Sequence, residues 1–218
     1  MCTVTCAITN NHIIFTSSRD IPISRVHSLP PKIYRKNNIN ILMPFDPQGK
    51  GSWIGASKFS IACILNHKGK ENSNKSRGKL LYNLLCNQTS INQIENISID
   101  YNSFRLIYLD KKNKKYYNCI WDGKCFKSEK IYSNLNIWSS NTIYNQSEIK
   151  YKSDFFNSIF NKEANKNELI DFHLNEKNIK NDNNIRTTSI TQIIHNDSVN
   201  MYYNDLLNSN DYYLKLSS

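Results

Sequence analysis

The chain has 218 residues, of which 39% are hydrophobic, so it is long enough for one domain with a substantial core. Its 13 tyrosines, 9 phenylalanines and 3 tryptophans exclude a chain that is disordered by composition. The net charge of +10 favours anionic partners in general, but the basic residues are scattered apart from a cluster at 111–115. No nucleic-acid-binding motif accompanies this charge, so we expect no nucleic-acid partner. From the length of the chain we expect one domain over residues 1–218.

The sequence gives no sign of a membrane span or of secretion. No apolar run approaches the ~18 residues that a membrane span needs, and we expect no secretory signal. The cysteines form no CxxC pair and no zinc-ligand spacing with histidine. We therefore expect a cytoplasmic protein without disulfide bonds, metal or cofactor. Five cysteines stand among apolar residues and are predicted to be buried, whereas Cys2 is set apart by its position; the five are Cys6, Cys63, Cys86, Cys119 and Cys125.

The first two predicted elements form a hairpin. Polar and apolar residues alternate over residues 3–9, which is the pattern of a half-buried strand, and residues 12–18 form a second strand. Asn10-Asn11 lies between them, and asparagine tolerates the positive φ of a tight two-residue turn.

The next part of the chain is first irregular and then regular. All five prolines fall in residues 19–50, which we expect to be irregular except for a short strand near 39–43. Leucines at helical spacing predict a helix over 77–87 with Ser76 as its N-cap. The other elements expected here are a hairpin of residues 52–57 and 60–66, a polar loop at 67–76 and a short helix near 90–97.

The second half continues the same mixture. Apolar residues predict a helical segment over 152–174 that breaks near Asn165. Strands are expected on both sides of it, at 103–109, 115–121, 124–128, 137–140, 188–193 and 199–203, the last two joined around Asn196-Asp197. Strands that open and close the chain, with helices in two separate blocks, predict an α+β layered domain with mostly antiparallel sheets.

Cys2 follows the first methionine, and this position gives it a special chemistry. A side chain as small as cysteine permits the removal of Met1 by methionine aminopeptidases. One residue would then carry a thiol nucleophile and a free α-amine that accepts its proton. The alternative is that cysteine stands at position 2 by chance.

The hairpin adds a second group to Cys2. With Asn10-Asn11 as a two-residue loop, paired positions sum to 21, so Cys2 lies opposite Arg19 on the same face of the sheet. A guanidinium at that place favours the thiolate form of Cys2. Asp20 would hold the α-amine or orient Arg19. The alternative for Arg19-Asp20 is a solvated turn after the strand, and a slip of one residue would move Arg19 to the other face.

Several short segments, in a fixed order along nearly the whole chain, resemble the NRDE-motif proteins, which are also called the transport and Golgi organisation family. The bacterial branch of that family opens with Met-Cys-Thr-Val-Thr, as this chain does. The other matching segments are 16–20 (TSSRD), 51–55 (GSWIG), 65–66 (LN), 75–78 (KSRG), 137–140 (IWSS), 171–173 (DFH) and 188–191 (TSIT).

The resemblance implies an N-terminal nucleophile (Ntn) hydrolase-like fold, an αββα sandwich of two mostly antiparallel sheets between helical layers. It implies cleavage of non-peptide amide bonds, as in the similar choloylglycine hydrolases and penicillin acylases. Cys2 then corresponds to the nucleophile, and Arg19 and Asp20 to the Arg and Asp of the motif. Asn66 corresponds to the asparagine whose side-chain amide helps to form the oxyanion hole; its alternative role is a turn residue.

The chain departs from the family pattern at two motif positions, where Ser18 replaces the asparagine and Ile21 replaces the glutamate. A second oxyanion asparagine of the hydrolase relatives falls at Ser140, with Asn141 beside it. Arg186 matches a late anion-binding arginine of bile-salt hydrolases, although a simple loop cation is the favoured interpretation. An Ntn mechanism needs no histidine base, so His67, His173 and His195 are not expected to be catalytic, and His173 is expected to cap or pack a helix.

These observations leave three candidate functions. The first is a Cys Ntn hydrolase that cleaves a small-molecule linear amide after removal of Met1. The second is a non-catalytic binding or carrier protein on the same fold for haem or a lipid-like ligand, in which a cysteine ligates haem iron. The third, a basic nucleic-acid binder, rests on the net charge alone and ranks last.

Overall fold

The computed structural model describes residues 2–9 and 11–217, and these form two compact units. One unit contains the described residues up to Arg25 together with Ser133–Leu216. The other unit is Val26–Tyr132. Each unit contains one antiparallel sheet with helices against it, and each is described by itself below.

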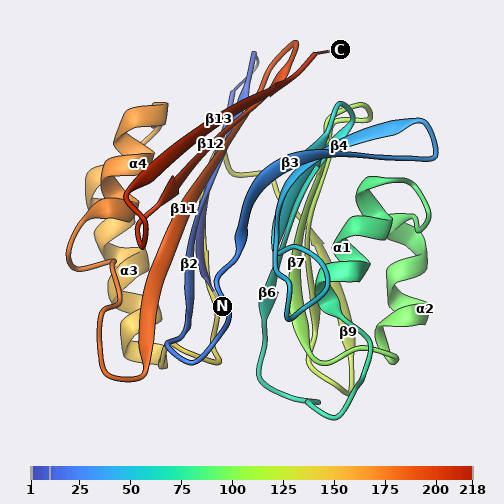
Figure 1. Ribbon diagram of the computed structural model, residues 1–218, viewed down its shortest axis with the longest axis horizontal. Coiled ribbons are helices and arrows are strands. Elements are labelled where there is room, and N and C mark those ends of the chain that lie inside the picture. The colour runs from blue at the N-terminus through green and yellow to red at the C-terminus, as the bar shows by residue number, and fades with distance from the viewer. Residues whose placement is uncertain (1, 10, 218) are drawn as a thin grey trace. The chain divides into compact units, whose positions relative to one another are not determined.

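The first unit is built on a six-stranded antiparallel sheet with the order β10-β1-β2-β11-β12-β13. The two helices of this unit, α3 (Gln146–Ile159) and α4 (Lys166–Leu174), lie along one face of the sheet (Figure 1). The strands are β1 (Cys2–Ile8), β2 (Ile13–Pro22), β10 (Leu135–Ser139), β11 (Ile185–His195), β12 (Val199–Asp205) and β13 (Asn210–Leu216).

The register of the first hairpin is the one that the sequence predicts. Cys2 pairs with Arg19, and Ile8 pairs with Ile13, so all paired positions sum to 21. Residue 10 of the predicted Asn10-Asn11 turn lies outside the described residues. Because side chains alternate along a strand, the even-numbered residues of β1 share one face of the sheet with Arg19, and the odd-numbered ones face the other way.

The helices of this unit begin where side-chain caps satisfy their first amides. Asn145 caps α3 in a capping box with Glu148, and Asn165 caps α4 in the same way with Glu168. The predicted break near Asn165 is thus confirmed, whereas the helical segment begins earlier than the expected residue 152. The helices bury an aromatic cluster against odd-numbered residues of β1; the cluster consists of Ala7, Ile14, Phe156, Phe160, Ala164, Leu169 and Phe172.

The second unit is built on a seven-stranded antiparallel sheet with the order β3-β4-β5-β6-β7-β8-β9. The helices α1 (Arg77–Leu85) and α2 (Ile94–Ser98) and the 3-10 turn η1 (Ile91–Gln93) lie on one side of it (Figure 1). Ser76 caps α1, as predicted. The strands are β3 (Leu29–Lys36), β4 (Ile39–Phe45), β5 (Ile54–Ser57), β6 (Ser60–Asn66), β7 (Phe104–Asp110), β8 (Lys115–Trp121) and β9 (Phe126–Lys130).

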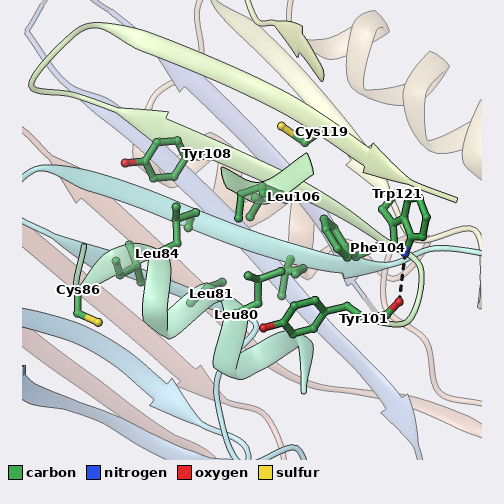
Figure 2. Close-up of a cluster of buried hydrophobic side chains, with 14 of the residues drawn as sticks. Leu80, Leu81, Leu84, Cys86, Tyr101, Phe104, Leu106, Tyr108, Cys119 and Trp121 are labelled. Carbon is green, nitrogen blue, oxygen red and sulfur yellow. Dashed lines mark hydrogen bonds between the residues drawn. The ribbon is translucent and has the colours of Figure 1, made fainter. Parts of the chain in front are cut away.

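The core of the second unit lies between α1 and the sheet. Figure 2 shows Leu80, Leu81 and Leu84 of α1 against side chains from the sheet such as Leu106, with Tyr101 and Trp121 at one end. The indole Nε1 of Trp121 donates a hydrogen bond to the backbone oxygen of Tyr101 at 3.1 Å. The layer is therefore apolar, and the indole N–H of Trp121 within it is hydrogen-bonded.

Three strand assignments correct the sequence-based prediction. Residues 29–36 were expected to be irregular but form β3, an edge strand whose register shifts between Leu29 and Lys32, so that Pro30 and Pro31 need no ladder partner. The strand β2 continues to Pro22, four residues beyond its predicted end. The edge strand β13 was not predicted at all.

The fold class is confirmed: the protein is α+β, with two large antiparallel sheets and a helical layer on each. In the part of the chain that the structure describes, no helix has both the length and the apolar character needed to cross a membrane.

Candidate functional site

Cys2 is the first residue of β1 and is held from both sides. Across β2 it pairs with Arg19, and the side chains of both residues are buried. Beyond the end of β10, the amide of Ser140 donates a hydrogen bond to the backbone oxygen of Cys2 at 3.0 Å. The ladder between β1 and β10 therefore continues to Cys2 and fixes the backbone of this residue between two neighbours.

Arg186 shares a sheet face with Cys2 and Arg19. In the register of β2 and β11, Arg186 lies opposite Ile21, and Ile21 is two residues from Arg19 on the same strand. Opposed residues and residues two apart on a strand point to the same face, which is the one opposite α3 and α4. The interpretation of Arg186 as a loop cation is therefore wrong, because it lies on β11. This face presents a thiol and two guanidinium groups.

Asp20 points to the other face, toward the helices. Its Oδ2 accepts a hydrogen bond from the hydroxyl of Tyr144 at 2.6 Å, and its Oδ1 accepts one from the hydroxyl of Thr187 at 2.7 Å. Burial raises the pKa of Asp20, while the two hydroxyls and the charge of Lys152 act to lower it. These contacts show Asp20 as a structural acceptor beneath the strand that carries Arg19.

Lys152 extends this network into the helical layer. It lies on α3 and is 4% exposed, and its Nζ donates to the backbone oxygen of Asn178 at 3.1 Å. The same ammonium lies 4.6 Å from the centre of the Tyr144 ring. Burial lowers the pKa of Lys152 to about 8, and the negative charge of Asp20 opposes this shift.

His173 has a packing role, as predicted. It lies on α4, it is buried, and its Nε2 is 3.0 Å from the hydroxyl oxygen of Thr5. Burial and the nearby charge of Lys152 lower the pKa of His173 to about 3, so the ring is neutral at physiological pH. Ser18, which replaces the asparagine of the motif, is also buried and accepts a hydrogen bond from the amide of Thr3 at 3.3 Å.

The remaining predicted site residues lie in two places. Ser140 is buried beside Cys2, and its hydroxyl oxygen is 3.0 Å from that of Thr142, while Asn141 follows it and is half-buried. Asn66 is the last residue of β6 in the other unit, where it pairs with Phe104. Its part in an oxyanion hole stays a prediction.

The cysteines differ from the expectation at one position. Cys125 is exposed, so the prediction that it is buried is wrong, and the other five cysteines, Cys2 included, are buried. Burial raises the pKa of the Cys6 thiol and that of the Cys119 thiol. Among residues 2–9 and 11–217, no three side chains of His, Cys, Asp or Glu are placed to hold a metal ion.

The family model for Transport and Golgi organisation 2 (TANGO2) matches residues 1–218. The chain belongs to the TANGO2 family. No curated protein matches it. The Arg-Asp pair by which the sequence resembles this family is the pair that β2 divides between its two faces, with Arg19 beside Cys2 and Asp20 in the helical layer.

Sequence reasoning missed the partners of Asp20 in this TANGO2-family chain. Tyr144 is 124 residues from Asp20 in the sequence, and Thr187 is 167 residues away. The one available signal was Lys152, a charged residue that stands close to Phe155, Phe156 and Phe160 of a predicted helix. A lysine at a core position needs a compensating partner, and this would have justified a search for a buried acid.

Proposed function

We propose that the protein is a Cys N-terminal nucleophile hydrolase that cleaves a non-peptide, linear amide bond after removal of Met1. The observation that carries this proposal is the register of β1 and β2, which pairs Cys2 with Arg19 on one face of the sheet. A guanidinium beside a thiol stabilises the thiolate, which is the nucleophilic form. Membership of the TANGO2 family over the whole chain supports it.

The proposed reaction has two halves. In the first, the α-amine of Cys2 accepts the thiol proton, and the sulfur attacks the amide carbonyl carbon. The tetrahedral adduct collapses, the C–N bond breaks, and the α-ammonium returns the proton to the leaving amine. In the second half, the α-amine deprotonates a water molecule that attacks the thioester. The C–S bond then breaks, which releases a carboxylic acid and restores the thiol.

The sheet face around Cys2 suggests the form of the substrate. Arg19 and Arg186 share this face with Cys2, and a guanidinium binds carboxylate in a bidentate manner. A linear amide that carries a carboxylate would suit these groups. For the oxyanion we assign donors from Ser140 and Asn141, of which Ser140 is already fixed to the backbone of Cys2. A free thiol nucleophile works in a reducing compartment, so we place the reaction in the cytoplasm.

The first experiment is the intact mass of the purified protein before and after reaction with a cysteine-reactive lactam probe. The matched variants are Cys2→Ala and Cys125→Ala, the second of which removes the exposed thiol. We expect the mass to show loss of Met1, and we expect one adduct that Cys125→Ala retains and Cys2→Ala loses. Met1 retained together with undiminished amide hydrolysis would overturn the mechanism, and so would labelling that Cys2→Ala leaves unchanged.

A second experiment tests the role of Arg19. The rate of thiol modification is measured against pH for the wild type, Arg19→Gln and Arg19→Lys. Loss of the guanidinium should slow thiol modification in Arg19→Gln across this pH range, because the reacting sulfur loses its neighbouring positive charge. Arg19→Lys keeps the charge and should lie between the two. Coincident profiles for all three proteins would remove the observation on which the proposal stands.

A further inference from the structure

The Val26–Tyr132 unit contains a cavity of about 670 Å³ that the proposed hydrolase chemistry does not use. This volume is within the range of small-molecule sites in proteins. Its lining combines two kinds of side chain, aromatic rings and lysines. The rings are Tyr34, Phe45, Tyr82 and Tyr101, and the lysines that matter below are Lys50 and Lys79.

The four aromatic side chains, called the aromatic wall below, combine apolar rings with the hydroxyl groups of three tyrosines. The rings of Tyr34 and Phe45 are 6.4 Å apart, and Tyr101 stands beside Leu80 at the edge of the core in Figure 2. Within residues 2–9 and 11–217, the hydroxyls of Tyr34, Tyr82 and Tyr101 have no hydrogen-bond partner. Lys36 Nζ lies 5.4 Å from the centre of the Tyr82 ring, and Lys75 Nζ lies 6.0 Å from the centre of the Tyr101 ring. The remaining ring faces of the wall can stack on a flat ring, and its hydroxyls can hydrogen-bond to the substituents of that ring.

The cationic side of the cavity is a built structure. The turn that carries Lys50 is fixed to the start of α1, because the amide of Ser52 donates to the oxygen of Gly78 at 3.4 Å and the hydroxyl of Ser76 donates to the oxygen of Gly49. A Cβ at Gly51 would lie 2.4 Å from the backbone of Gly78, so only glycine allows this contact.

The charge of this side is uncompensated. Among the described residues, the ammonium groups of Lys50 and Lys79 have no ion-pair or hydrogen-bond partner, whereas Lys75 is paired with Asp100 at 2.6 Å. The first turn of α1 contains no acidic residue. The partial positive charge of the helix N-terminus adds to that of the two lysines, so this side attracts an anion.

A third feature points to a ligand with hydrogen-bonding edges. Asn83 also lines the cavity, and its side chain is half-buried. The carboxamide of asparagine matches the donor and acceptor edge of a purine.

We propose that this cavity binds a nucleoside monophosphate. The base stacks on the tyrosine rings and meets the Asn83 amide, and the phosphate lies between Lys50 and Lys79 at the start of α1. This site is independent of Cys2, and its success or failure leaves the hydrolase proposal unaffected.

Calorimetric titration of the full chain tests the proposal, with adenosine 5′-monophosphate, adenosine and inorganic phosphate as probes. The binding variant is Lys50→Ala with Lys79→Ala. The matched control is Lys115→Ala with Lys130→Ala, which removes the same charge from exposed positions of the same unit. Asn83→Ala and Tyr82→Leu test the base side, and circular dichroism verifies that each variant is folded.

We expect saturable binding of the monophosphate, with adenosine and phosphate each weaker by about tenfold or more. The Lys50/Lys79 variant should lose about tenfold in affinity and most of the salt dependence, and the control pair should stay within about twofold of wild type. Absence of monophosphate binding at millimolar concentration would overturn the proposal. Equal affinity for phosphate alone would do the same, and so would equal losses in the two double variants.

Discussion

The two helix–sheet layers of this protein are filled in opposite ways. Beneath α1, sixteen buried residues form an apolar cluster. Beneath α3 and α4, the buried apolar cluster has seven residues, and buried polar groups fill much of the rest, among them Asp20, Lys152, His173 and Thr5. The polar layer supports the sheet that carries Cys2.

This difference separates the layer that mainly stabilises the fold from the layer that mainly fixes side chains in place. An apolar layer gains free energy in proportion to buried area and tolerates changes of residue that keep its volume. A hydrogen-bonded polar layer gains little net free energy, but it fixes its members in one arrangement. The strand β2 links the polar layer to the face that carries Cys2, because Arg19 and Asp20 are neighbours whose side chains point to opposite faces of the sheet. The following changes test the contrast, from the largest expected effect to the smallest.

Asp20→Ala should have the largest effect. It leaves the hydroxyls of Tyr144 and Thr187 without their acceptor and removes the negative charge that acts most strongly on buried Lys152. We expect the free energy of unfolding to fall by about 4 kcal/mol in urea denaturation. Asp197→Ala, at an exposed position, is the control and should change it little. A loss below about 1 kcal/mol would mean that the polar network does not hold this layer together.

Leu81→Ala tests the apolar layer. Leu81 is completely buried on α1, and its removal leaves a cavity against the seven-stranded sheet. We expect a loss of about 3 kcal/mol in the free energy of unfolding. Leu81→Met, which conserves volume, should cost less than about 1.5 kcal/mol. If both substitutions cost the same, then packing does not determine the stability of this layer.

The buried ammonium of Lys152 gives the polar layer its own pH dependence. Its pKa is about 8 in the folded protein and close to 10.5 in the unfolded chain. Between these values the unfolded chain binds more protons, so this group makes stability rise with pH from about 8 to about 10.5. The slope is at most about 1.4 kcal/mol per pH unit.

The measurement is the difference in unfolding free energy between wild type and Lys152→Met at several pH values from 7 to 10. Because other groups titrate in both proteins, their contributions cancel in the difference. The difference should move in favour of the wild type as pH rises. A constant difference would show that Lys152 keeps an ordinary pKa.

Lys150→Ala should have the smallest effect. Lys150 and Asp154 form an exposed ion pair at 2.6 Å on the outer side of α3, two residues from Lys152. Exposed pairs of this spacing contribute about 0.4 kcal/mol, and 1 M salt should remove the contribution. Thermal unfolding at low and high salt provides the measurement. An effect as large as that of Asp20→Ala would erase the distinction between the surface and the interior of this layer.

The sequence predicts the parts of the site that depend on local rules. The pairing of Cys2 with Arg19 follows from strand alternation and a two-residue turn, and both are short-range. The cap at Ser76 and the break at Asn165 are local in the same sense. For Asp20 the sequence predicts a role in holding the α-amine or orienting Arg19, with a solvated turn as the alternative, and the turn is wrong because Asp20 is buried within β2. Its partners could not be predicted, because they come from β11 and from the segment before α3, far along the chain.

There is a separate physical reason why the sequence-based prediction missed the strand β3. Pro30 and Pro31 are typical of a loop, but an edge strand with a register shift accommodates them, since an unpaired edge needs no amide hydrogen. The sequence does not reveal which strand lies at an edge, because that depends on the order of the whole sheet. Two consecutive prolines in a segment known to lie in the middle of a sheet would have excluded a strand there.

Those two prolines also determine how this molecule meets other copies of itself. A sheet edge with free amide and carbonyl groups is a template on which another chain can add a strand. The edge strand β3 lacks amide hydrogens at Pro30 and Pro31. The opposite edge strand, β9, carries Lys127, Glu129 and Lys130 on exposed positions. The seven-stranded sheet is therefore protected at both ends against growth by strand addition, and we expect it to resist fibril formation at concentrations where unprotected sheets polymerise.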